Sequence, residues 1–233
     1  ASVITAVTAQ NTKAVTAVEG ISLQVIAAQI ATVLDDLEVG AIKIGMLATP
    51  EIIDTVARAL GRYDGPIVLD PVMVAKSGDA LLQDDAVATL RDVLLPRATI
   101  LTPNLPEAAR LLGAADAADR DEMIAQGQAL AALGPGAVLM KGGHATEAVC
   151  TDILLDTETV LAELTAPRIA TRNTHGTGCT LSSAIASGLA KGMPVVEAVT
   201  AAHTYLQGAI GAADTLTIGS GHGPVHHFHE VWS

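Results

Sequence analysis

The sequence predicts an α/β fold, in which a mostly parallel sheet carries helices on both faces. Short apolar runs alternate along the chain with longer segments in which apolar residues recur at helical spacing. A strand, a crossover helix and a second strand form the unit from which parallel sheets are built. No repeat, low-complexity linker or change of composition interrupts this alternation. We therefore expect residues 1–233 to form one domain with a three-layer αβα architecture.

Composition indicates the kind of core that such a domain needs. Half of the 233 residues are hydrophobic and only 16% are charged, against about 25% charged residues in an average soluble protein. Aromatic residues make up 2% of the chain, so the core must consist of alanine, valine, isoleucine and leucine. This composition excludes a disordered chain, and the length fits one large domain because single cores grow up to roughly 250–300 residues.

Charge and targeting signals limit the possible partners. The chain has 13 basic and 25 acidic residues, a net charge of −12, and the basic residues are scattered, so a nucleic-acid backbone would repel it. No apolar stretch approaches the ~20 residues that span a bilayer, and the first residues lack the basic leader of a signal peptide. Two cysteines are too few for a disulfide framework. We expect a cytoplasmic protein with no nucleic-acid or membrane partner.

Periodicity places the individual elements. Predicted strands of the crossover units cover residues 2–9, 41–47, 66–69, 99–102 and 137–140. Predicted helices cover residues 22–37, 84–95, 106–112, 121–133, 177–191 and 195–212, and one more begins at residue 49. Two further strands, residues 149–156 and 159–164, form an antiparallel pair, because the polar turn between them suits a hairpin.

Local signals mark two of the helix ends. Thr49-Pro50-Glu51 supplies a capping residue, a proline in the first turn and an early carboxylate, which together favour a helix start. Gly192-Met193-Pro194 separates the last two predicted helices as a stop and a restart.

The end of the chain combines aromatic residues with histidines. Phe228 and Trp232 are two of the four aromatic residues, and because large rings are usually buried, we expect the tail to pack down against the core. Four histidines lie in the same segment, His222, His226, His227 and His229. Adjacent histidines rarely chelate together, and no cysteine or carboxylate cluster accompanies them. We therefore expect this segment to close the C-terminus over the sheet and not to bind a metal.

Polar residues follow the ends of three predicted parallel strands. These residues are Asp70, Asn104 and Lys141, and open α/β sheets bind ligands along this rim. Asp70 before Pro71 is equally typical of an ordinary turn, and Glu107 in the turn after Asn104 is typical of a carboxylate at a helix N-terminus. Lys141, between an apolar strand and two glycines, is poorly placed for a surface role. Together they indicate a ligand site.

The strongest local signal is a glycine-rich helix start. Residues 173–180 read Asn-Thr-His-Gly-Thr-Gly-Cys-Thr, and Gly176 and Gly178 let backbone N–H groups point the same way. Such a start suits phosphate, or the charge that develops in phosphoryl transfer, although it is not the G-x-x-x-x-G-K-[ST] loop. Cys179 lies at its tip, where a helix N-terminus favours the basic and nucleophilic thiolate. The alternative is a small buried cysteine, the role that we assign to Cys150.

Seven stretches form one ordered set that spans nearly the whole chain. They are residues 3–12, 43–47, 69–78, 102–108, 141–144, 174–179 and 223–229. On these stretches the chain resembles the ribokinase superfamily and, within it, the hydroxymethylpyrimidine kinase/phosphomethylpyrimidine kinase family of thiamine biosynthesis. The resemblance implies a ribokinase-like fold. It also implies ATP- and magnesium-dependent phosphorylation of 4-amino-5-hydroxymethyl-2-methylpyrimidine and then of its monophosphate.

The resemblance also implies a role for each site residue. Cys179, at a position where sugar kinases carry an aspartate base, would help to remove the substrate hydroxyl proton. The backbone groups implied to hold the transferring phosphate are those of Gly176, Thr177 and Gly178. The residues implied to contact the nucleotide phosphates are Lys141, Asn104 and Thr174. The residues implied to organise magnesium are Asp70 and Glu107. The residues implied to bind the pyrimidine are Gln10, Met46 and Val72.

Two features depart from the family pattern. A strand and a glycine-rich loop, with an aspartate that holds the pyrimidine, normally precede the first matching stretch, and neither appears before it in this sequence. We expect the sequence to be a fragment, because the loss of a central strand would leave buried backbone groups unpaired. In addition, His203 stands where relatives often carry a lysine near the nucleotide.

Two other functions stay open. A pyridoxal kinase shares the fold and the cysteine, and pyridoxal also offers a hydroxymethyl group on a nitrogen heterocycle. A non-catalytic protein that binds pyrimidine or nucleotide would fit the absent front segment, although Asp70, Glu107, Lys141 and Cys179 argue against it. Relatives commonly dimerise, so we expect a homodimer.

Overall fold

The computed structural model describes residues 1–73, 82–143 and 148–232, so residues 74–78 and His144 of the matching stretches lie outside the described residues. The strands are β1 (Ala6–Gln10), β2 (Val15–Gly20), β3 (Ile42–Ile44), β4 (Ile67–Leu69), β5 (Ile100–Leu101), β6 (Val138–Lys141), β7 (Val149–Leu155) and β8 (Val160–Pro167). The α-helices are α1 (Leu23–Asp36), α2 (Pro50–Ala59), α3 (Asp84–Thr89), α4 (Leu105–Leu112), α5 (Arg120–Ala131), α6 (Thr177–Ala190) and α7 (Val195–Gly211). Three short helical turns complete the set, η1 (Leu90–Leu94), η2 (Leu95–Arg97) and η3 (Ala213–Thr215).

The main sheet contains six strands in the order β3-β4-β5-β6-β7-β8. Strands β3 to β6 are parallel, whereas β7 and β8 form the predicted antiparallel pair. The turn of this pair is held by Asp156, whose Oδ1 accepts from the N–H groups of Glu158 and Thr159 at 2.8 and 2.7 Å. Because parallel strands end at the same edge, the segments after β4, β5 and β6 lie along one rim.

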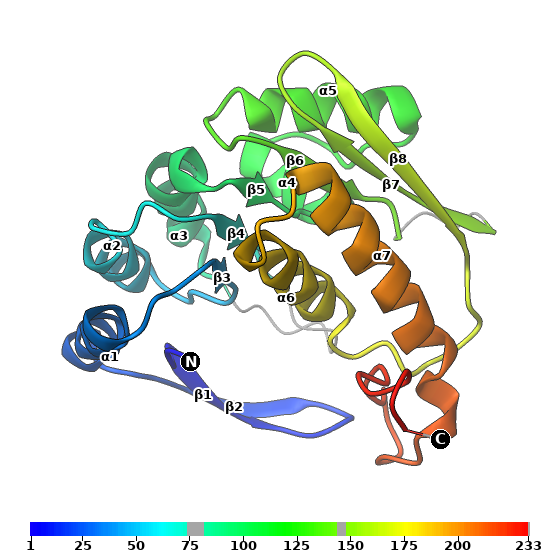
Figure 1. Ribbon diagram of the computed structural model, residues 1–233, viewed down its shortest axis with the longest axis horizontal. Helices are drawn as coiled ribbons and strands as arrows, with labels where there is room; N and C mark the ends of the chain where they lie inside the picture. Colours follow the sequence, from blue (N-terminus) through cyan, green and yellow to red (C-terminus); the bar gives the residue numbers. More distant parts are fainter. Residues whose placement is uncertain (74–81, 144–147, 233) are drawn as a thin grey trace.

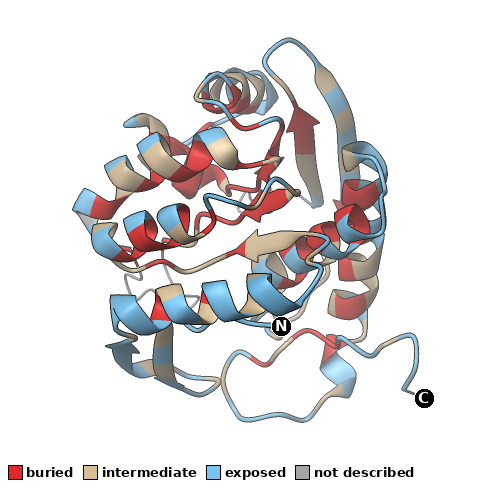
Figure 2. Ribbon diagram, turned by 60° about the vertical axis from the view of Figure 1, so that its left-hand side comes forward, coloured by how far each residue is buried: buried red, intermediate tan, exposed pale blue. Residues whose placement is uncertain are grey.

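Helices cover both faces of this sheet, which confirms the predicted αβα layers (Figure 1). Successive strand residues point to opposite faces. Leu69 and Met140 belong to the apolar cluster that includes residues of α1 to α5, and their neighbours Val68 and Leu139 belong to the cluster beneath α6 and α7. Figure 2 shows the buried residues concentrated in the strands and on the helix faces that cover them.

The predicted helix ends agree with the structure. Thr49 caps α2, because its hydroxyl accepts from Ile52 N at 3.4 Å, and Pro50 is the first residue of that helix. Helix α6 stops before Gly192, which has φ +81°, and α7 restarts after Pro194. In the part of the chain that the structure describes, no helix has both the length and the apolar character required to cross a membrane.

The first strand differs from its prediction. Strand β1 pairs antiparallel with β2, which is absent from the predicted set, and the two form a separate two-stranded sheet. This hairpin lies apart from the main sheet (Figure 1). Strand β2 has the sequence Val-Thr-Ala-Val-Glu-Gly and is largely exposed, so it lacks the apolar run by which a buried strand is recognised.

The prediction that the aromatic rings of the tail are buried is wrong. Phe228 and Trp232 are 52% and 60% exposed and stack on each other with ring centroids 4.7 Å apart. Instead Val225 and His226 are buried, and His226 N donates to Ala209 O of α7 at 2.9 Å. The tail packs against α7 through the His229 ring, which lies so close that Gly208 has no room for a Cβ.

Truncation of a central strand residue should test the two-layer core. Leu139, 1% exposed, lies in β6 between two neighbouring strands. We expect Leu139→Ala to lower the free energy of unfolding by about 2–5 kcal/mol, because the surrounding layers can fill the cavity only in part. Leu161→Ala, on the 38% exposed side chain of β8, should cost less than about 1 kcal/mol. Urea unfolding monitored by circular dichroism measures both, and equal losses would contradict the assigned core.

Candidate functional site

The strand-end residues predicted from the sequence meet at the rim of the sheet. Asp70 directly follows β4, Asn104 follows β5 and Lys141 is the last residue of β6. The Lys141 ammonium lies 3.3 Å from Asp70 Oδ1. The backbones of Asn104 and Lys141 form an isolated parallel bridge three residues beyond the Leu101–Val138 pair of β5 and β6. The parallel register thus places a carboxylate, an amide and an ammonium group side by side.

The strand-end residues belong to a polar cluster that consists of Asp70 and the residues around it, Lys43, Thr102, Asn104, Glu107, Lys141 and Ser182. Asp70 is buried at its centre. It is 2% exposed, and its Oδ2 lies 3.6 Å from the Lys43 ammonium and 3.1 Å from the Ser182 hydroxyl. Burial alone would raise the pKa of Asp70, but the ammonium groups of Lys141 and Lys43 outweigh this effect and hold the pKa below its ordinary value. The carboxylate is therefore charged in the folded protein, and both lysines favour this charge.

Glu107 caps helix α4 and also belongs to the polar cluster. It forms a capping box with Asn104 at the start of α4, in which Asn104 N donates to Glu107 Oε2 and Glu107 N to Asn104 Oδ1, both at 2.8 Å. The same Oε2 lies 3.9 Å from the Lys141 ammonium. Burial raises the pKa of Glu107, although Lys141 and the Asn104 N–H act in the opposite direction. Both interpretations of Glu107, as a helix-end carboxylate and as part of a ligand site, thus agree with its contacts.

The glycine-rich helix start lies against this cluster. Gly176 adopts the left-handed conformation with φ +85°, and α6 begins at the next residue. Ser182 Oγ lies 2.9 Å from Gly178 O and 3.1 Å from Asp70 Oδ2, so the first turn of the helix is joined to the rim. A Cβ on Gly178 would lie 3.5 Å from Lys141 Nζ and 3.9 Å from Asp70 Oδ2. The N–H groups at this helix start and the Lys141 ammonium therefore border the same space, and we call this segment, residues 176–179, the cradle.

Cys179 is exposed at the cradle, whereas Cys150 is half-buried in β7. An exposed free thiol at a helix N-terminus can be reached by a substrate. Thr174, three residues before the helix, accepts from Thr177 N at 3.4 Å through its backbone oxygen and so shapes the turn into the cradle.

The three residues predicted to bind the pyrimidine come from separate segments. Val72 is half-buried and its N–H donates to Asp70 O at 2.8 Å, which places it next to the polar cluster. Met46 is half-buried after β3, and its carbonyl accepts from the Thr5 hydroxyl at 3.0 Å. Gln10 is exposed at the end of β1. Within the described ranges no hydrogen bond or ion pair joins Gln10 to the cluster, and its role stays a prediction.

Three members of the cluster are missing from the sequence prediction: Lys43, Thr102 and Ser182. Lys43 stands between two isoleucines in a predicted strand, and a lysine in an apolar strand is itself a signal. Ser182 follows Gly178 by four residues, one helical turn, so its side chain faces the cradle. The Thr102 hydroxyl donates to Asp70 Oδ1 at 3.5 Å. Thr102 directly follows β5, and a threonine at the end of a strand gives no sequence signal of a site.

A further acid, the half-buried Asp152, lies beside Lys141. Asp152 on β7 is the register partner of Lys141, and its Oδ1 accepts from Gly142 N at 2.9 Å, which fixes the turn after β6. Burial raises the pKa of Asp152, although the hydrogen bond from Gly142 N and the nearby His203 act in the opposite direction. His203 itself is buried on α7. The His203 imidazole therefore lies close to an acid that holds the Gly142 turn.

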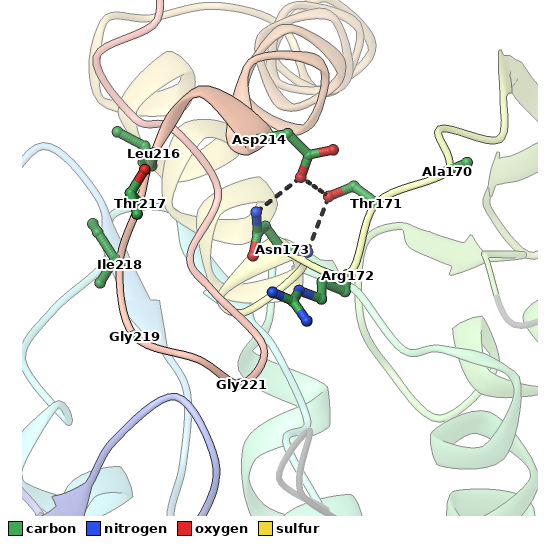
Figure 3. A pocket seen from close by; sticks show the side chains of 10 residues that line it. All are labelled: Ala170, Thr171, Arg172, Asn173, Asp214, Leu216, Thr217, Ile218, Gly219 and Gly221. Atoms are coloured by element: carbon green, nitrogen blue, oxygen red, sulfur yellow. Dashed lines mark hydrogen bonds between the residues drawn. The ribbon is translucent and has the colours of Figure 1, made fainter.

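A pocket of about 770 Å³ flanks the segment that leads into the cradle (Figure 3). One wall is the stretch from Ala170 to Asn173, and the opposite wall is the loop from Leu216 to Gly221. Asp214 joins the two walls, because it accepts hydrogen bonds from the Thr171 hydroxyl and from Asn173 Nδ2. The pocket is lined by none of the residues of the polar cluster.

The likeness of the chain to known proteins decides its family. A sequence profile described as phosphomethylpyrimidine kinase matches residues 1–226. The chain belongs to the phosphomethylpyrimidine kinase family. A hydroxymethylpyrimidine/phosphomethylpyrimidine kinase of Rhizobium meliloti (strain 1021) is 56% identical over 232 residues, which cover 100% of this chain and 87% of that protein.

Solved structures agree with this phosphomethylpyrimidine kinase family. The phosphomethylpyrimidine kinase of Clostridium difficile 630 superposes with a TM-score of 0.78 at 42% identity, covering 90% of this chain and 86% of its own. The ADP complex of Bacillus subtilis pyridoxal kinase superposes with a TM-score of 0.89 at 34% identity, covering 99% and 87%. The ribokinase-like fold predicted by the resemblance is confirmed.

Removal of the central ammonium group should destabilise the rim in a pH-dependent way. We expect Lys141→Met to lower the free energy of unfolding at pH 7 by about 3–5 kcal/mol, because it leaves a buried carboxylate short of a partner. The depressed pKa of Asp70 means that the pair stabilises the fold above the carboxyl's unfolded pKa, and that this stabilisation is lost as the pH falls through the lower folded pKa. The difference between wild type and variant should therefore shrink on acidification.

Urea unfolding at a series of pH values measures this difference, with Lys191→Met at the exposed end of α6 as the matched control. The control should leave the unfolding midpoint nearly unchanged. A loss in Lys141→Met that does not vary with pH would contradict the ion pair as its cause.

Proposed function

We propose that this chain transfers the γ-phosphoryl group of ATP to the hydroxymethyl group of 4-amino-5-hydroxymethyl-2-methylpyrimidine, and then to the monophosphate so formed. The observation that carries the proposal is the contact between the cradle and the buried Lys141–Asp70 pair. Phosphoryl transfer needs positioning and charge neutralisation more than covalent chemistry. Backbone N–H groups, a helix dipole and an ammonium group around one space supply both.

Each part of the site takes one role in the transfer. The substrate hydroxyl oxygen attacks the γ-phosphorus, the bond from phosphorus to the β–γ bridging oxygen breaks, and ADP leaves with that electron pair. The thiolate of Cys179 accepts the hydroxyl proton. The backbone N–H groups of Gly176, Thr177 and Gly178 stabilise the transferring group. The side chain of Lys141, with Asn104 and Thr174 beside it, contacts the nucleotide phosphates.

The carboxylates at the rim fit a magnesium ion. Mg²⁺ is held in phosphoryl-transfer sites by one or two carboxylates together with waters and substrate phosphates, and Asp70 and Glu107 provide two carboxylates beside the cradle. The oxygens of Asp70 already contact Lys43, Lys141 and Ser182, so we assign the direct contact to Glu107 and charge balance to Asp70. The ion would neutralise charge on the β- and γ-phosphates. No group of three or more His, Cys, Asp or Glu side chains suited to a metal occurs among the described residues.

The pyrimidine is proposed to bind between the rim and the hairpin. Val72 and Met46 follow β4 and β3 and present half-buried apolar side chains. Gln10 on β1 offers an amide that can both donate to and accept from a pyrimidine ring. We also propose that residues 1–233 act as one kinase domain in a cytoplasmic homodimer, and that the net charge of −12 excludes a nucleic-acid partner.

The second candidate is a pyridoxal kinase, which the high structural similarity to the Bacillus subtilis pyridoxal kinase favours. The identity favours the pyrimidine, because it is 34% to that enzyme and 56% to the Rhizobium meliloti kinase. Both alcohols would use the same cradle and the same thiol, so the choice depends on the pocket for the ring.

Steady-state ADP release, coupled to NADH oxidation, distinguishes these functions. With ATP and Mg²⁺, we expect turnover with the pyrimidine alcohol and with its monophosphate, and a lower kcat/KM with pyridoxal. Turnover with pyridoxal alone would make the chain a pyridoxal kinase. Binding of the pyrimidine in calorimetry without any ADP release would make it a binding protein.

Replacement of the cradle thiol should separate chemistry from binding. We expect Cys179→Ala to lower kcat by about 10²–10⁴-fold, the range for loss of a positioned base. The ATP affinity should change by less than about twofold, because groups that act in the transition state add little to ground-state binding. Cys150→Ala, the matched control in β7, should retain the wild-type kcat. An unchanged kcat in Cys179→Ala would exclude the thiol as the base.

A further inference from the structure

The β1–β2 hairpin depends on anchors at its two ends. At its base the Thr5 hydroxyl donates to Met46 O at 3.0 Å, and Gln29 exchanges two hydrogen bonds of 3.0 Å with the backbone of Ile4. Among the described residues, the two strands pair only with each other between the ends, and most of their side chains are exposed. A two-stranded hairpin is at best marginally stable in water on its own. Its position is therefore set by what holds its base and its tip.

The tip is held through Thr12 by a glycine-containing loop near the C-terminus, and Figure 1 shows this end of the hairpin directed toward the C-terminal segment. His222 N donates to Thr12 O at 2.7 Å, and Gly221 N donates to Thr12 Oγ1 at 3.1 Å. Gly219 has φ +66°, and a Cβ on either Gly219 or Gly221 would collide with Thr12. The loop therefore accepts Thr12 at a distance that only glycine permits, and we call these contacts the Thr12 clasp.

The loop that receives Thr12 is fixed independently of the hairpin. His222 Nδ1 lies 3.1 Å from Arg172 O, and Gly223 N donates to Asn173 Oδ1 at 3.0 Å. Arg172 and Asn173 belong to the segment that leads into the cradle, and the same loop forms one wall of the pocket in Figure 3. Loss of the clasp would thus release the hairpin and leave the loop and the cradle in place.

We propose that Thr12 is a positioning residue for the substrate alcohol. Gln10 ends β1 two positions before Thr12, and the turn between them is stiff, because Asn11 Oδ1 accepts from the N–H groups of Lys13 and Ala14 at 2.8 and 3.1 Å. The clasp ties the hairpin that carries Gln10 to the segment that precedes the cradle. Without it the hairpin would have to be ordered when the substrate binds, which weakens binding. This inference rests on the proposed role of Gln10.

The kinetic test uses a variant of unchanged shape. Thr12→Val keeps the branched side chain and removes the acceptor of Gly221 N. We expect KM for the pyrimidine alcohol to rise about three- to tenfold, the effect of one lost hydrogen bond, while KM for ATP changes less than about twofold because the cradle stays in place. Thr16→Val is the matched control, since the Thr16 hydroxyl donates to Ala9 O within the hairpin and takes no part in the clasp.

A second readout does not depend on catalysis. Lys13 is exposed at the hairpin tip, so limited digestion by trypsin can cut after it, and mass spectrometry detects the fragment that begins at Ala14. We expect this cut to become faster in Thr12→Val and to keep its wild-type rate in Thr16→Val. An unchanged rate in Thr12→Val would overturn the clasp.

A steric variant tests the same contact from the other side. Gly221→Ala places a methyl group against Thr12 O, and we expect both the faster cut and the higher KM for the alcohol. The double variant Thr12→Val/Gly221→Ala should raise KM for the alcohol by less than the product of the two single increases, because both substitutions break the same contact. Faster tryptic cleavage after Lys13 with an unchanged KM for the alcohol would overturn the positioning role of Thr12. Failure of the wild-type chain to release ADP would instead overturn the proposed function and, with it, the role of Gln10.

Discussion

A buried ion pair between Lys141 and Asp70 fixes the geometry of the rim. A carboxylate that is 2% exposed cannot keep its charge without partners, and here the partners come from β3, β6 and α6 through Lys43, Lys141 and Ser182. These elements are far apart in the sequence. Each must therefore hold its place for the charge to be compensated, and the helix start that forms the cradle is held at the same point.

This arrangement explains how a chain with a net charge of −12 can offer a site for phosphates. Two ammonium groups, one helix N-terminus and the N–H groups of a glycine turn are gathered at one edge of the sheet together with Asp70 and Glu107, whereas the other acidic residues whose burial the structure describes are not buried. Local fields at a partly buried site are screened less than the charge of the whole chain. The same ammonium group of Lys141 can thus serve the fold and, in the proposed function, the nucleotide.

Much of the site follows from the sequence because a parallel sheet places its strand ends at one edge. Asp70, Asn104 and Lys141 could be grouped from three strand ends alone, and the cradle could be recognised from its glycines and from Cys179. Lys43 and Ser182 carry weaker sequence signals, and their contacts with Asp70 depend on the pairing of β3 with β4 and on the orientation of α6 against the sheet. The substrate residues Gln10, Met46 and Val72 come from the family resemblance, and their roles await the experiments on activity.

The sequence by itself determined the layered α/β architecture, the helix caps and the order of the motifs, since these depend on periodicity and on residues close in the chain. The tertiary structure decided the separate β1–β2 hairpin, the exposed rings of Phe228 and Trp232, and the contact of Thr12 with Gly221, which lies 209 residues later in the chain. Such features depend on which surfaces meet and how closely backbones approach. Neither quantity is set by local propensity, because both arise only when distant segments pack together.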